Sequence, residues 1–440
     1  MKRRLTTIAC AMLLSAAAMQ AQGQWDLKRC IDHAISHNIS IKQRDNLIKQ
    51  SELQLSTAKN SRLPDLNASV GENLSFGRGL TAENTYTNTN TSNTSFGVST
   101  SIPLFTGMRI ENTIKLGQLN LDATTADLEK AKNDIAMQVA QQYIQIVYSK
   151  ELVAVAHRQT GIDSMQVERL KEMLNHGKAS KAEVSQQMAA LAQSQLTVTQ
   201  AENEYRMALL NLSQLLELPS PEGFAIADVD VSAFSTGVLP SADAIYSDAL
   251  GIKPEIAAES LRLQGTERSI KIAEAARYPQ LYLSGGLGTN YYTTSGFDAD
   301  GFGRQLKNNF SQSIGLNLSI PLFNRFATRN SIRSAEIDRD NQRLQLDNAK
   351  KALYKEIQQV YYNAVSADAK YQSSIAAAQS SEDAFELMQA KYENGKATIT
   401  EFNESKNNLM KAQSDLMQAK YEYLYQTALI EFYRGKPMKF

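Results

Sequence analysis

The sequence predicts a mainly α-helical chain with a β-barrel portion, in which long coiled-coil helices continue into membrane-type strands. Three observations lead to this fold class. The stretch SIPLF occurs at Ser101–Phe105 and again at Ser319–Phe323. Each copy closes a run of alternating apolar and small polar residues, and a long run without proline, rich in Ala, Gln and Ser, follows it. In those later runs apolar residues recur every seven positions, as they do in a coiled coil.

Residues 1–23 have the pattern of a secretory signal peptide. Basic residues near the start precede an apolar stretch, and small residues follow it. The alternative, a membrane anchor, needs a longer apolar stretch to cross ~30 Å of hydrocarbon. Removal of this segment would leave Cys30 as the one cysteine of the chain. A single cysteine excludes an intrachain disulfide and a cysteine-rich metal site.

The charges of the chain balance, since 46 Lys and Arg residues stand against 46 Asp and Glu residues. A balanced charge gives no reason to expect nucleic acid as a partner. His33 and His37 have the spacing of two ligands on one helix face, but no third ligand is near in the sequence. We therefore expect neither a metal nor a cofactor. Phosphate-loop, nucleophile-elbow and zinc-protease motifs are also missing from the sequence, so we expect no enzyme.

Two halves of the sequence share one register. Ser101 and Ser319 lie 218 positions apart, and the same offset places the turn-like stretch at Gly177 on the one at Gly395. We interpret this register as an internal duplication. Each repeat reads as helix, strand, loop, strand, long helix, glycine turn and helix. The predicted domains are a signal peptide at 1–23, a first repeat at 24–218, a connector at 219–243 and a second repeat at 244–440.

The longest helices are predicted directly after the SIPLF copies. The first, Gly107–Leu174, would be on the order of 100 Å long if straight. The returning helix, Ser180–Leu216, is roughly half that length, and Leu27–Lys59 is about as long again. Beyond the tip glycines, a seam repeats every seven residues, and Met188 fills one intervening position of its first copy. The seam residues are Val184, Leu191, Val198, Tyr205 and Leu212, then Phe402, Leu409, Leu416, Tyr423 and Ile430.

Strands with a period of two precede each SIPLF copy. Ile314, Leu316 and Leu318 alternate with small polar residues, as do Phe96 and Val98 in the first half. A half-buried sheet of a soluble domain and a transmembrane barrel both fit this alternation. Export, and strands near the ~9 to 11 residues that cross a bilayer, favour the barrel. Four strands per chain cannot close a membrane barrel, which needs ~8, so several chains must contribute.

The two ends of the predicted strands differ in composition. Gly77–Thr94 and Asn290–Asn309 are rich in Asn, Thr, Gly and Tyr, and we predict them as loops between paired strands. At the opposite ends, Pro103 and Pro321 are expected to mark the strand-to-helix junctions. Proline lacks the N–H group that would continue the hydrogen-bond ladder.

Together these features resemble the TolC family of outer-membrane channel proteins. The resemblance rests on the opening Trp25–Leu27, an R-x-P-x-L motif at Arg62 and Arg277, both SIPLF junctions, both glycine tips and the closing Glu431–Gly435. The family fold is a homotrimer. Each chain gives four strands to one twelve-stranded β-barrel, which continues into an α-helical tunnel. The resemblance therefore implies a place in the outer membrane of a Gram-negative cell, with the helices extending into the periplasm.

The same resemblance implies a passive exit duct. In the family the duct docks with a periplasmic adaptor (membrane fusion) protein and an inner-membrane pump of RND or ABC type. It expels small molecules or secreted proteins. The expected partners are these two proteins, two further copies of the chain and outer-membrane lipid. The alternative is a structural or adhesive trimeric coiled-coil protein of the envelope, which would use the strands as an anchor without transport.

The resemblance also assigns roles near the tips. Glu183, Glu401 and Glu404 match acidic positions of the family's aperture, where repeated carboxylates would select against anions, although a solvated helix face is the simpler reading of each. Tyr392 matches a tyrosine of the closing network, but the arginine expected two residues after Gly395 is absent, so that network must differ. Candidate contacts of the adaptor are Gly177, Lys178, Ala179, Ser180, Gly395, Lys396, Ala397 and Thr398.

Overall fold

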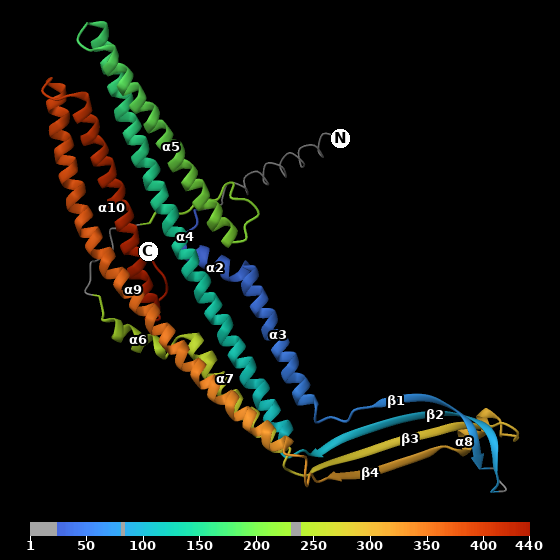
Figure 1. Ribbon diagram of the computed structural model, residues 1–440. Coiled ribbons are helices and arrows are strands. Elements are labelled where there is room, and N and C mark those ends of the chain that lie inside the picture. The colour runs from blue at the N-terminus through green and yellow to red at the C-terminus, as the bar shows by residue number, and fades with distance from the viewer. Residues whose placement is uncertain (1–23, 81–83, 230–238) are drawn as a thin grey trace, which may run out of the picture. The chain divides into compact units, whose positions relative to one another are not determined.

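The computed structural model describes residues 24–80, 84–229 and 239–440 as helices and one four-stranded sheet (Figure 1). The predicted signal peptide and part of the predicted connector lie outside the described residues. The helices are α2 (Leu27–His37), α3 (Ile39–Asn60), α4 (Arg109–Asn175), α5 (Lys181–Leu215), α6 (Ala242–Leu250), α7 (Pro254–Ala275), α8 (Phe302–Asn308), α9 (Ala327–Glu393) and α10 (Ile399–Tyr433). The strands are β1 (Asn67–Leu80), β2 (Tyr86–Phe105), β3 (Gln280–Thr294) and β4 (Ser311–Ser319).

The chain divides into two compact units. Of the described residues, the first unit contains those in 24–46, 126–257 and 348–440, and the second contains those in 47–125 and 258–347. Both units take segments from both halves of the sequence, and α4 and α9 contribute to each. The two compact units therefore do not coincide with the two predicted repeats. The division into repeats at 24–218 and 244–440 stays a prediction from the sequence.

The four longest helices form two hairpins of equal size. Both α4 and α9 have 67 residues, and both α5 and α10 have 35. Every one of these helices in the second half begins and ends 218 positions after its counterpart. Within the first unit, α5 runs back along α4 and α10 runs back along α9 (Figure 1). None of the described helices has an apolar stretch long enough to cross a membrane.

The predicted helix Leu27–Lys59 is interrupted at Asn38. Asn38 is the C-cap of α2, since its N–H still donates to the Ala34 carbonyl at 2.8 Å while its ψ of 133° leaves the helical range. The Asn38 side-chain oxygen then accepts from the Ser40 N–H at 2.9 Å, at the start of α3. The same amide donates to the Leu215 carbonyl at 3.3 Å, which ties the break to the end of α5. One asparagine thus serves both helix ends, a common use of its short polar side chain.

The first unit also anchors the start of the described chain. The Trp25 N–H donates to the Ala225 carbonyl, and the Ala227 N–H donates to the Trp25 carbonyl, both at 2.9 Å. From α4, the Tyr143 hydroxyl donates to the carbonyl of Ala227 at 2.8 Å and lies 3.2 Å from that of Trp25. Burial raises the pKa of Tyr143, and the charges of Asp26 and other nearby groups add to this effect. The described part of the predicted connector is therefore packed against the helices.

The strands form one antiparallel sheet in the order β1-β2-β3-β4. β1 pairs with β2 from Asn67 opposite Ser99 to Leu80 opposite Tyr86. The predicted loop Gly77–Thr94 is therefore wrong over most of its length. Its Asn and Thr residues have a loop-like composition, but threonine suits a pleated strand, and β1 and β3 supply ladder partners on both sides of β2.

A short helix replaces part of the other predicted loop, Asn290–Asn309. β3 continues to Thr294, and α8 begins at Phe302. The Gln305 side chain accepts from the Tyr292 N–H and donates to the Tyr292 carbonyl, both at 2.9 Å. These two hydrogen bonds hold α8 against β3.

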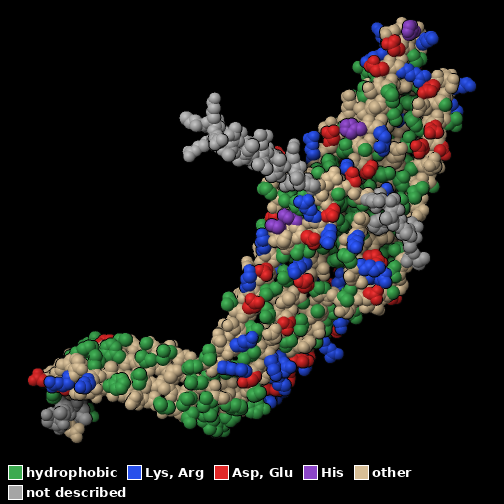
Figure 2. Space-filling model, turned by 180° about the vertical axis from the view of Figure 1, so that it is seen from behind, with side chains coloured by type: hydrophobic (Ala, Val, Ile, Leu, Met, Phe, Trp, Pro, Cys, Tyr) green, Lys and Arg blue, Asp and Glu red, His purple; other side chains and the backbone are tan. Residues whose placement is uncertain are grey.

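The two faces of the sheet differ as the period of two predicts. Opposed residues share a face, so Val98 lies beside Leu287, and Leu283 lies beside Leu316. Leu283 is half-buried, whereas Val98, Leu287, Leu316 and Ile314 are exposed, with Ile314 at 87%. On the sheet face seen in Figure 2, hydrophobic and uncharged atoms dominate and charged side chains gather at the far end.

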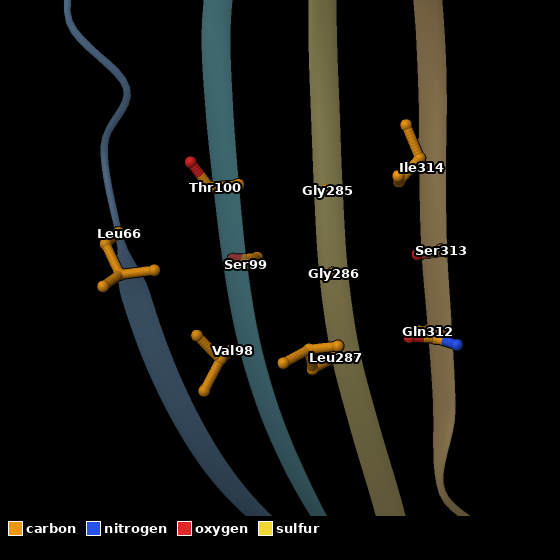
Figure 3. Close-up of a pocket in the computed structure, with 10 residues that line it drawn as sticks. All are labelled: Leu66, Val98, Ser99, Thr100, Gly285, Gly286, Leu287, Gln312, Ser313 and Ile314. Carbon is orange, nitrogen blue, oxygen red and sulfur yellow. The ribbon is translucent and has the colours of Figure 1, made fainter.

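A shallow hollow of about 630 Å³ lies on the sheet (Figure 3). Gly285 and Gly286 leave the middle of β3 without side chains there, and Leu66, Val98 and Ile314 stand around them. None of the side chains that line the hollow is charged.

The two strand-to-helix junctions share one backbone conformation. Gly107 and Met108 both have a φ of 64°, and Arg325 and Phe326, 218 positions later, have φ of 56° and 63°. Two successive left-handed residues thus redirect the chain before α4 and again before α9. Such residues usually carry a conformational cost unless they are glycine.

The junction prolines occupy different positions. Pro321 follows β4, which ends at Ser319. Pro103 lies inside β2, opposite Tyr282, and the strand continues to Phe105 across a register shift. The expectation that Pro103 ends the ladder is therefore wrong, because an irregularity in the pairing accommodates a residue that lacks an N–H.

Candidate functional site

Each long hairpin turns at a glycine. The Lys178 N–H donates to the Met173 carbonyl at 2.7 Å, and the Gly177 N–H donates to the Leu174 carbonyl at 2.9 Å. These are the paired bonds of a Schellman motif. The second tip, at Gly395, repeats both bonds 218 positions later, at 2.8 and 3.0 Å. Both glycines have a φ of 70°, where a residue with a Cβ would be strained.

Each returning helix begins with a capping box. Glu183 Oε2 accepts from the Ser180 N–H at 2.6 Å and from the Ser180 hydroxyl at 2.9 Å, and Ser180 Oγ accepts from the Glu183 N–H at 3.2 Å. Glu401 and Thr398 make the same bonds at 2.7, 2.8 and 3.3 Å. Two of the three predicted aperture glutamates thus have a local structural role, because they satisfy backbone donors at a helix start.

The capping bonds favour the charged form of both carboxylates. The N–H of Ser180, followed by its hydroxyl, lowers the pKa of Glu183. The N–H and then the hydroxyl of Thr398 lower the pKa of Glu401 in the same way. A lowered carboxyl pKa means that the cap contributes its stability above the ordinary carboxyl pKa. That contribution is lost as the pH falls through the lowered value.

We expect Glu183→Gln to remove most of the pH dependence of the first cap. In the parent, exchange of the Ser180 amide should accelerate, relative to its intrinsic rate, as the pH falls through the lowered pKa of Glu183, because the protonated side chain is a weaker acceptor. Glutamine keeps a side-chain oxygen but does not titrate. Hydrogen exchange followed by mass spectrometry measures the difference, with Glu404→Gln as the control. Identical pH profiles in the parent and Glu183→Gln would contradict the capping role.

Glu404 differs from the other two glutamates. Its side chain is exposed, and among the described residues it has neither a hydrogen bond nor an ion pair. It lies three residues after Glu401 on α10, so the two are neighbours on the helix surface. The position 218 residues earlier is Gln186, so the first hairpin carries one carboxylate fewer at its tip.

The remaining tip residues are mostly open to solvent. Lys178, Ser180, Lys396 and Thr398 are exposed at the turns. Ala179 and Ala397 are half-buried, and Ala179 packs against the apolar core below the tips. That core joins the two hairpins and is made of Leu170, Val184, Phe385, Ile399 and Phe402.

Tyr392 lies where the two hairpins meet. Its ring stacks on Phe402, with centroids 5.0 Å apart, and the Arg169 guanidinium lies 5.9 Å from its centroid. Burial raises the pKa of Tyr392, and the charge of Glu183 adds to this effect, whereas the charge of Arg169 opposes it. The structure therefore brings Tyr392 of the second hairpin together with Arg169 of the first.

Arg169 of the first hairpin places an arginine beside Tyr392 of the second hairpin. Ala397 stands where the resemblance leads us to expect arginine. Arg169 Nη1 lies 3.5 Å from the Glu393 carboxylate, and its Nη2 donates to the Glu393 carbonyl at 3.4 Å. Sequence reasoning missed Arg169 because this contact spans 224 positions of the chain. The one signal in the sequence was that Arg169 lies three residues after Gln166, so the two side chains lie on one face of α4.

His33 and His37 form a stacked pair whose ring centroids lie 4.0 Å apart. The Trp25 ring meets the His33 ring edge-on at 5.0 Å. Burial, followed by the charge of His37, lowers the pKa of His33. Nowhere in the described part of the chain do three or more potential metal-binding side chains come together.

Comparison with known proteins places the chain in a family. The family described as outer membrane efflux protein matches residues 30–217 and 245–434. The outer membrane protein TolC of Vibrio cholerae is 22% identical over 322 residues, which cover 71% of this chain and 70% of that protein. The pyoverdine export outer membrane protein OpmQ of Pseudomonas putida is 22% identical over 317 residues, which cover 72% of this chain and 64% of that protein. The match thus spans less than two thirds of OpmQ.

A solved structure shows the same fold. The outer membrane protein VceC from Vibrio cholerae matches with a TM-score of 0.75 at 18% identity, over 94% of this chain and 97% of that chain. The predicted fold class, mainly helical with a strand portion of the TolC type, is confirmed at this level. Because the family match covers both halves, the chain belongs to the outer membrane efflux protein family, the family of TolC, and lies in the outer membrane.

Proposed function

We propose that the protein is the exit duct of a tripartite efflux or type I secretion system, through which substrates pass passively to the exterior. The observation that carries this proposal is the contact between the two hairpins below their tips, where Tyr392 stacks on Phe402 and Arg169 of the other hairpin lies beside Tyr392 and Glu393. Glu183 follows the first turn, and Glu401 and Glu404 follow the second. The family supports the proposal, and so do the export and efflux functions in the names of its members. A channel of this kind needs no enzymatic activity.

We propose that three copies form the duct. β1 and β4 are the edges of the sheet and have no further strand partner among the described residues. Three such sheets, paired edge to edge, would give a barrel of twelve strands, above the practical minimum of ~8. The exposed apolar face would meet outer-membrane lipid, and the face of glycine and serine would line the lumen. The 67-residue helices would extend this lumen into the periplasm as a tunnel.

The tips are the proposed docking place of a periplasmic adaptor. An inner-membrane pump of the RND or ABC type would deliver the substrate behind it. The exposed tip residues Lys178, Ser180, Lys396 and Thr398 support this assignment, since they offer hydrogen-bonding groups and positive charge beside half-buried alanines. An adaptor with a helical hairpin and acidic side chains at its turn would complement such a surface.

We expect Glu401→Gln with Glu404→Gln to lower the cation selectivity of the purified protein in planar bilayers. Carboxylates repeated around a narrow mouth concentrate cations and repel anions. Glutamine at position 401 keeps an oxygen for the cap, so the change removes charge and leaves the helix start intact. The reversal potential under a salt gradient measures selectivity. The control is Glu168→Gln, an exposed carboxylate of α4 that pairs with Lys171.

Two outcomes would contradict these proposals in different ways. Channels that conduct with the parental reversal potential would remove the aperture role from Glu401 and Glu404. A parent that never conducts would contradict the duct itself and favour the alternative, a structural or adhesive coiled-coil protein of the envelope.

A further inference from the structure

One carboxylate lies on the apolar face of the sheet. Glu72 stands between Val70 and Leu74 on that face of β1, because the side chains of a strand alternate. Val70 and Leu74 are both exposed. The charged residues of the four strands are Glu72 and Arg78, and Arg78 lies two residues before the end of β1. A charge inside a lipid-facing strand is destabilising, so Glu72 needs hydrogen-bond partners.

Two hydroxyl groups of β2 supply part of this need. Ser92 Oγ donates to Glu72 Oε1 at 2.6 Å, and Thr94 Oγ1 donates to Glu72 Oε2. Each carboxylate oxygen can accept a further hydrogen bond. β1 is an edge of the sheet, and among the described residues no strand pairs with its other side. A further donor on a neighbouring strand would therefore have to come from another copy of the chain.

The opposite edge strand, β4, carries such a donor on the same face. Gln312 lies opposite Leu287 in the ladder and precedes Ile314 on the apolar face. Its side chain is exposed, and among the described residues it makes no hydrogen bond. The side-chain amide of glutamine has two N–H donors, which a carboxylate can accept. Gln312 therefore offers the group that Glu72 lacks.

The positions of these two residues indicate how one sheet meets the next. On each edge strand, the apolar run of this face ends at a polar side chain, Glu72 in β1 and Gln312 in β4. Straight across the ladder, Gln312 lies in line with Ala68 of β1, and Ala68 precedes Glu72 by four residues. The rim of a lipid-facing belt must be level around a closed barrel. A stagger of four residues between β4 of one copy and β1 of the next brings Gln312 level with Glu72.

Barrel geometry permits few other values of this stagger. The apolar face stays continuous only if the stagger is an even number of residues. Four residues per chain is about one per strand, and ~3.4 Å of rise against ~4.8 Å between strands tilts the strands by about 35°. Staggers of two and six give about 20° and about 47° by the same geometry. Four fits the ~35–45° of outer-membrane strands, whereas two lies well below this range and six slightly above it.

The small residues of the other face agree with a stagger of four. Within the chain, serine stands opposite glycine at Ser69–Gly97, Gly71–Ser95, Ser284–Gly315 and Gly286–Ser313. A Cβ added to Gly71 would lie 3.2 Å from Ser95 Oγ, so these pairs fit closely. A stagger of four places Ser313 opposite Gly71 of the next copy, and Gly315 opposite Ser69. A stagger of six would place Gly315 opposite Gly71, and a stagger of two would place Ser313 opposite Ser69.

We propose that Glu72 of one copy accepts a hydrogen bond from the Gln312 amide of the next, and that this contact fixes the register in which the sheets close. Directly opposed residues of antiparallel strands have Cβ atoms ~4.5–5.5 Å apart, which suits a bond between these two side chains. A stagger of six would instead put Ile314 beside Glu72. The inference rests on the proposed trimeric duct, and it adds the register and the partner of Glu72.

Disulfide crosslinking in the full-length protein tests the register. A disulfide needs Cβ atoms ~3.5–4.5 Å apart, which directly opposed residues approach and diagonal neighbours do not. Asn73→Cys with Ser311→Cys reports a stagger of four, Asn73→Cys with Ser313→Cys a stagger of six, and Ser69→Cys with Ser313→Cys a stagger of two. Cys30 is buried, and Cys30→Ala removes it from every variant. We expect the first pair alone to give covalently linked trimers on denaturing gels.

A second measurement tests the polar contact itself. Gln312→Glu would place two carboxylates opposite each other, so the yield of detergent-resistant trimer should fall about fivefold, the effect of ~1 kcal/mol. Exchanging the two side chains, Glu72→Gln with Gln312→Glu, restores a donor beside an acceptor and should recover the trimer. The control is Thr100→Val, on the same face but in the inner strand β2, which should leave the yield unchanged.

The outcomes separate the register from the duct. The register is overturned if either of the other two cysteine pairs crosslinks instead, or if no pair crosslinks in a protein that migrates as a trimer. The contact is overturned if Gln312→Glu keeps the parental yield, or if the exchanged pair does no better than Gln312→Glu. A parent that stays monomeric in mild detergent would overturn both proposals. Trimers that crosslink as expected but never conduct would uphold the register and contradict the duct.

Discussion

Replacing Gly107 by alanine should lower the free energy of unfolding by roughly 2–5 kcal/mol. Gly107 has a φ of 64°, a conformation that costs a residue with a Cβ about 1–2 kcal/mol. A Cβ at this position would also lie 2.7 Å from the Ala275 carbonyl oxygen and 2.9 Å from Tyr278 Cβ. The carbonyl belongs to the last turn of α7, so relief of the clash requires movement of backbone.

Two controls separate the backbone cost from the clash. Arg325, 218 positions later, has a φ of 56° and carries a full side chain, so Arg325→Gly should change stability by at most about 1 kcal/mol. Gly161, inside α4, has no atom within 4 Å of an added Cβ, so Gly161→Ala should stabilise the protein by about 0.5–1 kcal/mol. Apparent melting temperatures from circular dichroism rank the three variants. A parental melting temperature for Gly107→Ala would contradict the junction geometry.

The helical hairpins could be predicted well because their signals are local. The predicted helix Gly107–Leu174 differs from α4 by two residues at its start and one at its end. Heptad spacing and a glycine at the turn depend only on neighbours in the sequence. Because the two halves share an offset of 218 positions, each helix predicted after a SIPLF copy in the first half predicted a counterpart in the second half. Our interpretation of the sequence as an internal duplication would account for this agreement.

The strands were predicted less well, because their extent depends on partners far along the chain. Thr87–Thr94 has a loop-like composition, yet the ladder to β1 makes it strand. Pro103 has no N–H to donate, yet β2 passes it through an irregularity beside β3. In both places, pairing across the sheet overrides the local preference of the residues.

At the tips too, features that depend on local contacts could be predicted, and features that depend on distant contacts were missed. The spacing Ser180-x-x-Glu183 is a capping-box signature, so the local role of this glutamate could have been read from the sequence. Arg169 could not, because its partners lie on the other hairpin. Lys406 did leave a signal, since it stands 218 positions after Met188, where the seam predicts an apolar residue. A charge at a seam position indicates a buried partner.

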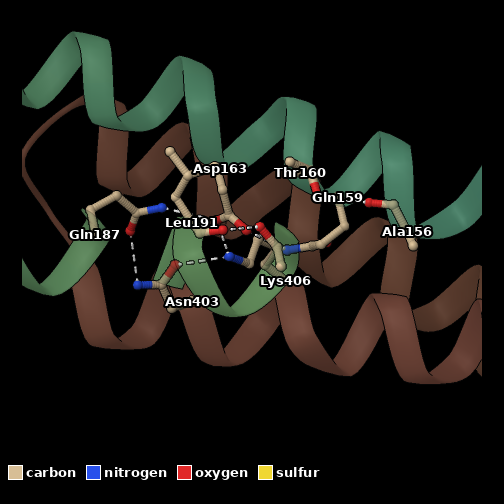
Figure 4. Close-up of polar contacts among 9 residues, drawn as sticks. Ala156, Gln159, Thr160, Asp163, Gln187, Leu191, Asn403 and Lys406 are labelled. Carbon is tan, nitrogen blue, oxygen red and sulfur yellow. Dashed lines mark hydrogen bonds and ion pairs between the residues drawn. The ribbon is translucent and has the colours of Figure 1, made fainter. Parts of the chain in front are cut away.

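Asp163 of α4 and Lys406 of α10 form a buried salt bridge (Figure 4), and removing one of its charges should cost more stability than removing both. Lys406→Met leaves Asp163 charged, 1% exposed and bonded only to amides, which should cost about 3–5 kcal/mol. The triple variant Asp163→Leu, Gln187→Met and Lys406→Met leaves no buried charge. It should lose less stability than Lys406→Met, because it leaves no unpaired buried charge and only the amides of Gln159 and Asn403 lose a partner. Gln187→Met is needed because the fully buried amide would otherwise lose its acceptor.

The exposed pair of Glu168 and Lys171 is the control, and Glu168→Gln should change stability by less than about 1 kcal/mol. Apparent melting temperatures of the full-length protein at neutral pH compare the variants. A parental melting temperature for Lys406→Met would mean that Asp163 is hydrated in the folded chain, which contradicts the buried salt bridge.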